Sequence, residues 1–353
     1  MAAITKRYFD TLPDGREVEL YRLENSRGAY VNILTYGGII HSACVPDKNG
    51  ALCDVVLGFD SLAPYLDTDL TGYMGALIGR HAGRIRNGVF TLNGRTYRLT
   101  KNDHGHQLHG GPVGLHNKVW RASVLDGMLI LDTSACHLEE NYPGNLTVRV
   151  VYGFSDAGEL SLEYFAASDE DTVVNLTNHC YFNLDGQGTG LVADNLLKIN
   201  ARLFAPCDAD CLTDGTLAEV AGTPFDFLDY HPIGERADAD DPQLRNAGGY
   251  DHCYVFTEGT RREFGEIARA YSEKTGISMR VLTDSPAVQF YGGNFLTAGI
   301  VGKGGVTYDR RSGFCLETQF IPNSLEYESY PHPILRAGEG FHYKTVFQFG
   351  NEK

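Results

Sequence analysis

The chain has 353 residues, of which 42% are hydrophobic and 21% charged, so it can bury a large core and global disorder is not expected. Lysine and arginine number 30 against 45 aspartates and glutamates, which gives a formal net charge of −15. Such a surface repels phosphate backbones and anionic headgroups, so nucleic acid and membranes are poor partners. We expect a neutral or cationic small molecule instead.

The features that report on cellular location favour the cytoplasm. No run of about 18 apolar residues could cross a bilayer, and residues 1–10 lack the apolar core of a signal peptide. Eight cysteines in so long a chain are too sparse for a disulfide scaffold. Cys207 and Cys211 stand four apart, but no second pair follows at zinc-ligand spacing. Free thiols in a reducing compartment are the better interpretation.

A two-residue hairpin is predicted around Asn93 and Gly94, because an Asn-Gly pair tolerates the positive φ angles of a type I′ turn. Residues 89–92 would pair with residues 95–98, which brings Phe90 opposite Tyr97. Further along, residues 146–152 and 160–164 alternate between apolar and polar side chains on either side of a glycine-containing turn. This period of two is typical of half-buried antiparallel strands.

Residues 266–273 could be helical by propensity, since alanine, glutamate and arginine favour helix. Ile267 and Tyr271 nevertheless stand on either side of Arg269 in an alternating pattern, and residues 277–281 alternate regularly between apolar and polar side chains. We therefore predict a hairpin. No linker, repeat or low-complexity tract divides the chain. The prediction is an all-β protein, with residues 1–353 forming a single domain that is a large antiparallel β-sandwich with few short helices.

Several polar clusters could carry chemistry. In residues 175–184, strand alternation would place five hydrogen-bonding side chains on one face, which indicates either a ligand site or a solvent face. Glu317 follows an apolar trio, where a carboxylate loses water and needs donors or a ligand. His104, His106 and His109 fall within six residues, but no acidic ligand lies among them, so we favour hydrogen bonding over metal binding.

Other enzyme classes are disfavoured by missing motifs. Residues 79–85 are glycine-rich and basic but lack the lysine and hydroxyl of a phosphate-binding loop. There is no Gly-x-Ser-x-Gly elbow and no dinucleotide fingerprint between a strand and a helix. One candidate base, several histidines, amides and aromatic rings remain, and this inventory suits proton transfer on a neutral, polyhydroxylated molecule.

Taken together, these segments resemble the aldose 1-epimerase (mutarotase) family over nearly the whole chain, from Tyr36 to Gly340. Six pieces match in the family's order: residues 79–85, 108–111, 175–184, 251–252, 289–296 and 313–319 with Pro322. The resemblance implies a mutarotase-like β-sandwich, a sugar cleft on one face, no cofactor and no metal. It leaves the oligomeric state open between a monomer and a weak dimer.

Roles carry over residue by residue from the resemblance. It implies that His179 is the general acid and Glu317 the general base. The sugar-binding positions are then Arg84, His109, Tyr181, Asp251 and Gln289. The chain departs from the family at Gly83, where asparagine is usual, and one side-chain contact to the sugar is therefore expected to be lost.

The implied reaction opens the hemiacetal ring of a free aldose such as galactose or glucose, rotates C1 about the C1–C2 bond and closes the ring again. Glu317 would take the proton of the C1 hydroxyl, and His179 would protonate the ring oxygen. We expect Asp251 to keep His179 protonated, and we expect an imidazolium and a carboxylate that face each other across a hexose-sized gap.

Three alternatives remain at this stage. A hexose-6-phosphate epimerase of the same fold would need a basic phosphate pocket, and no lysine–arginine cluster lies beside the matched motifs. A glycoside hydrolase would need two carboxyl groups, for which Glu317 and Asp251 are candidates. A non-catalytic sugar-binding β-sandwich would bind aldoses without accelerating their mutarotation.

Overall fold

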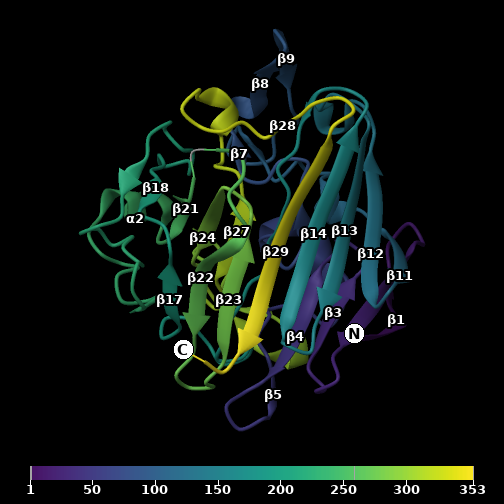
Figure 1. Cartoon of the computed structure of the whole chain (residues 1–353), viewed down its shortest axis with the longest axis vertical. Helices are drawn as coiled ribbons and strands as arrows, with labels where there is room; N and C mark the ends of the chain where they lie inside the picture. Colours follow the sequence, from purple (N-terminus) through teal and green to yellow (C-terminus); the bar gives the residue numbers. More distant parts are fainter. Residues whose placement is uncertain (1, 258, 353) are drawn as a thin grey trace.

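A computed structural model describes residues 2–257 and 259–352 and is built almost entirely of antiparallel β-strands, as predicted (Figure 1). Its described residues contain two short α-helices, α1 (Thr68–Thr71) and α2 (Pro242–Ala247). Each begins at an aspartate side chain that accepts a hydrogen bond from the first turn, and each ends at a left-handed glycine. Neither is long and apolar enough to cross a membrane.

The largest sheet has nine strands in the order β11-β12-β13-β14-β29-β23-β22-β17-β20. Its strands are β11 (Arg121–Leu125), β12 (Met128–Ala135), β13 (Leu146–Phe154), β14 (Glu159–Ser168), β17 (Leu196–Ile199), β20 (His231–Pro232), β22 (Gly265–Tyr271), β23 (Ser278–Thr283) and β29 (Gly340–Gly350). The C-terminal strand β29 joins the two halves of this sheet, because it pairs with β14 on one side and β23 on the other.

Two five-stranded sheets accompany it. The first consists of β1 (Ala3–Thr11), β2 (Glu17–Glu24), β3 (Tyr30–Leu34), β4 (Ile40–Pro46) and β5 (Leu52–Asp54). The second consists of β19 (Ala218–Glu219), β18 (Leu203–Ala205), β21 (Asp251–Val255), β24 (Ala287–Tyr291) and β27 (Cys315–Gln319), in this order.

Short two-stranded ladders tie down the connections between these sheets. They are β6 (Leu77–Ile78) with β16 (Thr177–Asn178), β7 (Arg84–Ile85) with β10 (Gln107–Leu108), β8 (Val89–Leu92) with β9 (Arg95–Arg98), β15 (Thr172–Val173) with β28 (Ile334–Leu335), and β25 (Ile300–Val301) with β26 (Thr307–Tyr308).

The sheets pack face to face around one large apolar cluster. In Figure 1 the purple N-terminal strands lie behind β12–β14, and β2 contacts β13 while β4 contacts β29. Alternate side chains of β13 are buried, as period-two patterning requires. The cluster includes Leu23 and Val31 from the first sheet, and Leu131 and Val148 from the nine-stranded sheet. The predicted β-sandwich is therefore confirmed.

The predicted hairpins are also confirmed. Strands β8 and β9 pair in the expected register, with Phe90 opposite Tyr97, and their rings stack 5.2 Å apart. Strands β13 and β14 pair over their whole lengths. Strands β22 and β23 form the hairpin that we preferred over a helix, but a bulge at Ile267 shifts the register. Ile267 is fully buried at the bulge, whereas Tyr271 beyond it is half-buried, so the bulge interrupts the expected alternation across Arg269.

Candidate active site

Three neighbouring strands of the second five-stranded sheet carry acidic and amide side chains onto one surface. Strand β24 lies between β21 and β27, and Gln289 stands directly opposite Glu317. Asp251 begins β21, and its Oδ1 accepts a hydrogen bond from the Gln289 amide nitrogen at 2.7 Å. The sheet thus holds Asp251, Gln289 and Glu317 side by side on rigid backbone.

The polar segment 175–184 lies beside this surface, but it does not form the regular strand that we expected. Thr177 and Asn178 form the short strand β16, Asn175 and Phe182 make isolated β-bridges, and every residue from 175 to 184 is buried. Asn175 donates to the Ala82 carbonyl, and Asn183 donates to the carbonyls of Gly190 and Ser312. The solvent-face interpretation is therefore wrong, and the asparagines fix backbone while His179 and Tyr181 reach the site.

The β7–β10 ladder supplies the opposite wall. Arg84 pairs with Leu108 in this ladder, so His109 emerges one residue beyond it. The Arg84 Nε donates to Asp103 Oδ2 at 2.6 Å, and Asp251 adds a second negative charge nearby. The guanidinium is thereby held between two carboxylates in a site that is largely shielded from water.

All seven residues predicted from the sequence line one cavity of about 440 Å³. They are Arg84, His109, His179, Tyr181, Asp251, Gln289 and Glu317. The volume lies within the usual range for small-molecule sites. Segments that are far apart in the chain therefore meet at one cavity, as the predicted site requires.

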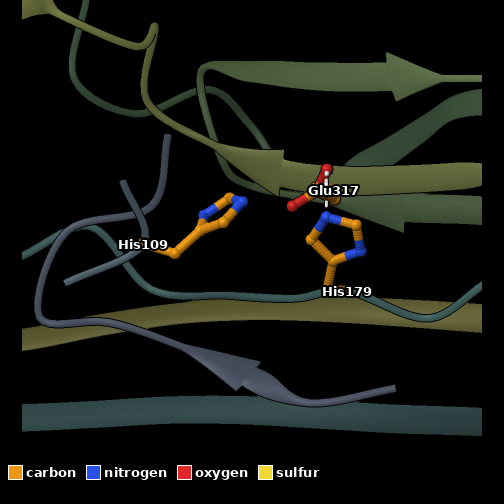
Figure 2. A group of neighbouring side chains, drawn as sticks. All are labelled: His109, His179 and Glu317. Carbon is orange, nitrogen blue, oxygen red and sulfur yellow. Dashed lines mark ion pairs between the residues drawn. The ribbon is translucent and has the colours of Figure 1, made fainter. Parts of the chain in front are cut away.

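His179 and Glu317, which both line this cavity, face each other across a short gap (Figure 2). The His179 Nε2 lies 3.7 Å from the Glu317 Oε1, and the two side chains are only 6% and 3% exposed. The expected hexose-sized gap between them is wrong, because 3.7 Å leaves no room for a ring. A substrate must instead approach both groups from the same side.

Burial dominates the protonation of this pair. It raises the pKa of Glu317 well above its ordinary value, helped by the charge of Asp251 and opposed by Arg84. It lowers the pKa of His179 to about 4. The expectation that Asp251 keeps His179 protonated is therefore wrong: loss of water disfavours the imidazolium, and Asp251 instead bonds Gln289.

His109 is a neutral hydrogen-bond donor. Burial, followed by the nearby charges of His179 and Arg84, lowers its pKa well below the ordinary value. Its Nδ1 accepts a hydrogen bond from the Gly83 backbone N–H at 3.2 Å, so the proton of the neutral ring resides on Nε2. Figure 2 shows this imidazole directed toward Glu317.

Gly83 thus contributes through its backbone. Its φ is +75°, and a Cβ there would lie 2.8 Å from the Pro322 Cβ. We expected Gly83 only to remove one side-chain contact to the sugar. Its backbone N–H also sets the tautomer of His109.

A metal ion is a poor fit to this cluster. His109, His179 and Glu317 each offer a ligand atom, and these atoms lie within 4.8 Å of one another. The Gly83 N–H, however, occupies the His109 Nδ1, so the Nε2 that faces the other two groups carries a proton and has no free electron pair. The donor set therefore suits a hydroxylated ligand, whose oxygens accept such a proton.

Several residues that line the cavity were not predicted from the sequence. Gln319 lies two residues beyond Glu317 on the same face of β27, is 2% exposed, and its Oε1 has no hydrogen-bond partner. Asp103 orients Arg84, and Tyr73 stacks edge-on against His109. The alternation of Glu317 and Gln319 in residues 313–319 was a usable signal for the first of these.

The Tyr181 hydroxyl already donates to the Gly72 carbonyl at 2.9 Å. Its ring stacks beneath His179, with centroids 5.1 Å apart. Tyr181 therefore forms the floor under the imidazole.

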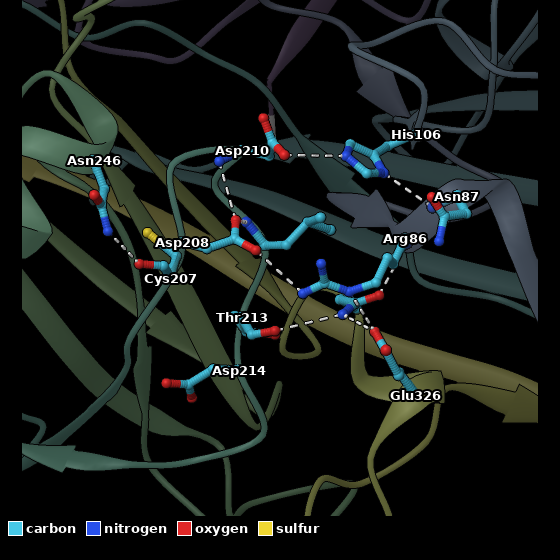
Figure 3. Close-up of polar contacts among 12 residues, drawn as sticks. Arg86, Asn87, His106, Cys207, Asp208, Asp210, Thr213, Asp214, Asn246 and Glu326 are labelled. Atoms are coloured by element: carbon cyan, nitrogen blue, oxygen red, sulfur yellow. Dashed lines mark hydrogen bonds and ion pairs between the residues drawn. The ribbon is translucent and has the colours of Figure 1, made fainter.

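The mouth of the cavity is bordered by residues 209–211, on a loop that ion pairs hold in place (Figure 3). Asp208 pairs with Arg86, which also binds Glu326, and Asp210 faces His106 at 3.6 Å. Cys211 on this loop contacts Asp251. The entrance is thus acidic and firmly anchored.

A larger groove of about 950 Å³ crosses the outer face of the nine-stranded sheet. Its charged lining residues are Arg121, Asp132 and Arg149, and both arginines pair with the aspartate. This groove has no free acid or base, so the chemistry belongs to the smaller cavity.

The fold and the site define an acid–base enzyme of the β-sandwich class with a polar, shielded cavity. The family model for aldose 1-epimerase matches residues 19–348, and the chain belongs to this family. It is 37% identical over 350 residues to galactose mutarotase from Sus scrofa, with 99% of each chain covered. It is 35% identical over 341 residues to aldose 1-epimerase from Escherichia coli, with 96% of each covered. An aldose epimerase homologue from C. elegans superimposes with a TM-score of 0.85 at 27% identity, covering 99% of this chain and 100% of that one.

Proposed function

We propose that this chain is an aldose 1-epimerase (mutarotase), an isomerase that interconverts the α- and β-anomers of free aldoses such as galactose and glucose. The observation that carries the proposal is the buried pair of Glu317 and His179, whose reacting atoms lie 3.7 Å apart in one cavity. Its relatives' names support the same activity. The eight free thiols support a cytoplasmic setting.

The closeness of the pair suits this reaction, because both oxygens that exchange protons are bonded to the same carbon, C1. Glu317 removes the proton of the C1 hydroxyl while His179 protonates the ring oxygen, and the C1–ring oxygen bond breaks. The resulting aldehyde turns about the C1–C2 bond, and the two groups reverse their transfers on its other face. The enzyme then regains its starting state with no second substrate.

Burial adjusts both groups for these transfers. A raised pKa makes Glu317 a stronger base, and a lowered pKa makes protonated His179 a stronger acid. In the free cavity burial favours the proton on Glu317. One transfer across the 3.7 Å between Glu317 and His179 generates the reactive carboxylate–imidazolium pair, so no proton from solvent is needed.

Arg84, His109, Asp251 and Gln289 bind further hydroxyl groups of the sugar. The Arg84 guanidinium and the His109 Nε2–H donate hydrogen bonds, whereas Asp251 accepts them. The Gln289 Oε1 is buried and has no partner within the described chain, so a sugar hydroxyl would satisfy it. Donors and acceptors are thus both present for a polyol.

Free aldoses fit this cavity better than hexose 6-phosphates. Arg84 is the one lysine or arginine among its described lining residues, and Asp103 already pairs with it. Asp69, Asp210 and Asp251 also line the cavity. A phosphate dianion would meet several negative charges and no unpaired basic side chain.

Polarimetry tests the proposal directly. The enzyme should accelerate the change in optical rotation of freshly dissolved α-galactose and α-glucose, with little effect on galactose 6-phosphate. A folded protein that leaves the spontaneous rate unchanged would contradict the proposal and favour a binding module. Faster turnover of the phosphate would favour the phosphate-sugar epimerase, and nitrophenol released from nitrophenyl galactoside would favour a hydrolase.

A further inference from the structure

Strand β27 places Cys315, Glu317 and Gln319 on one face, because alternate residues of a strand share a face, and Glu317 and Gln319 line the cavity. All three are buried. Cys315 contacts the imidazole, with its Sγ 3.5 Å from the His179 Nδ1. His179 therefore stands on the Cys315 side of Glu317, and Gln319 lies on the opposite side.

Gln319 has the properties of an unfilled binding group. Its side chain lines the cavity, it is 2% exposed, and its Oε1 has no hydrogen-bond partner in the described chain. A buried amide oxygen without a partner is destabilising, because it has given up its hydrogen bond to water. The residue opposite Gln319 on β24 is Ala287, which has no polar side chain to satisfy it. A hydroxyl group of the ligand would do so.

The order of Cys315, Glu317 and Gln319 along β27 indicates which hydroxyl of the sugar Gln319 meets. In the proposed reaction, which this inference rests on, Glu317 reaches the oxygen on C1 and His179 reaches the ring oxygen. The ring oxygen and C2 are the two ring neighbours of C1, so C2 lies on the side of Glu317 away from His179. That side is where Gln319 stands.

We infer that Gln319 binds the 2-hydroxyl group of the sugar. The amide can accept from this hydroxyl through Oε1 or donate to it through Nε2. The contact also has a mechanical purpose: C1 must turn about the C1–C2 bond, so C2 has to stay still. Gln319 is thus a binding residue that anchors the fixed end of the rotating bond.

Substrate analogues test this assignment against a purely structural role. The wild-type enzyme should turn over 2-deoxygalactose with a kcat/KM roughly tenfold below that of galactose, the loss expected for one hydrogen bond in a buried site. Gln319→Met, which keeps the length of the side chain, should lower kcat/KM for galactose by a similar factor. On 2-deoxygalactose the variant and the wild type should be about equal, because the contact is already absent. Gln319→Asn, which shortens the amide, should behave in the same direction.

The controls separate the possible failures. With 6-deoxygalactose the Gln319→Met penalty should persist in full, because the 2-hydroxyl is still present. An equal penalty on galactose and 2-deoxygalactose, in a variant whose circular dichroism and melting temperature match the wild type, would overturn the inference. The inference would also be overturned if Gln289→Met, and not Gln319→Met, lowered kcat/KM for galactose while leaving kcat/KM for 2-deoxygalactose unchanged. Absence of mutarotation in the wild type would instead refute the proposed function.

Discussion

Glu317 owes its reactivity to its position on a strand that the protein covers almost completely. A carboxyl group at a solvent-exposed strand end would have an ordinary pKa and would be a weak base. Burial against Asp251 raises that pKa, while burial lowers the pKa of the neighbouring His179 to about 4. The two shifts run in opposite directions, which is the arrangement that proton exchange between neighbouring oxygens requires.

Removing either group should abolish most of the catalysis. We expect Glu317→Gln and His179→Asn each to lower kcat by roughly 10² or more, since a positioned acid or base contributes about that much. Polarimetry on fresh α-galactose measures the loss. His231→Asn is the matched control, because His231 is a partly exposed imidazole that also pairs with a glutamate, Glu235. Near-normal equilibration by either active-site variant would remove it from the mechanism.

The sequence was sufficient to predict which residues form the site, but not how they are protonated or how far apart they lie. All seven predicted residues line the cavity, because polar side chains in otherwise apolar strands need partners. The protonation of His179 was not predictable, since it depends on how completely Tyr181, Tyr73 and the β27 strand exclude water. The 3.7 Å separation of His179 and Glu317 likewise follows from tertiary packing of segments 138 positions apart.

Among the elements, the connection between β6 and β7 has the greatest influence on the site. It contains Gly83, whose N–H orients His109. The glycine-rich character of residues 79–85 was visible in the sequence, but its purpose was not, because the left-handed conformation and the contact with Pro322 arise only in the folded chain. The regular hairpins were predictable because their turns and alternation are local, whereas the Ile267 bulge depends on the neighbouring strand.

Gly83→Ala should impair both stability and sugar binding. A β-carbon at φ +75° costs about 1–2 kcal/mol, and it would lie 2.8 Å from the Pro322 Cβ, so the backbone must move and the N–H to His109 must shift. We expect a raised KM for galactose together with a lower free energy of unfolding. Gly28→Ala separates the two effects, since Gly28 has φ +82° and nothing within 4 Å of the added carbon.

Gly28→Ala should therefore lose stability and keep its KM. Urea unfolding gives the first quantity and polarimetry the second. An unchanged KM in Gly83→Ala, at a temperature where that variant is folded, would show that the Gly83 N–H does not position His109.

For the molecule as a whole, we propose that residues 1–353 fold as one domain, because its main core cluster contains both Ala2 and Phe349. The folded protein also buries several neutral imidazoles. Burial lowers the pKa of His41, His116 and His252 to about 3, and that of His81 and His179 to about 4. In the unfolded chain these rings titrate near 6.5.

The protein should consequently be sensitive to mild acid. Between about pH 6.5 and 4 the unfolded chain binds protons on these imidazoles and the folded chain does not, so stability is present above 6.5 and falls as the pH drops. Each such histidine contributes up to about 1.4 kcal/mol per pH unit. Asp251 and Glu317, whose pKa values are raised, act in the opposite direction, but six imidazoles, with His109 included, outnumber two carboxyls.

Urea unfolding from pH 7 to 4.5 measures this slope and should show one transition at each pH. His252→Phe, which fits the ring among Phe204 and Phe225, should reduce the slope by about one proton. His104→Asn, at a side chain that is 83% exposed, should leave it unchanged. A stability that does not depend on pH over this interval would contradict the neutral, buried state of these rings.

The lining of the catalytic cavity begins at Thr68 and ends at Pro322. During synthesis on the ribosome, His109 and His179 therefore emerge long before the strand that carries Glu317, and nine-tenths of the polypeptide must be made before the base meets its acid. Premature termination between His179 and β27 leaves a protein fragment that has every imidazole of the site and lacks the carboxyl group needed to open a sugar ring.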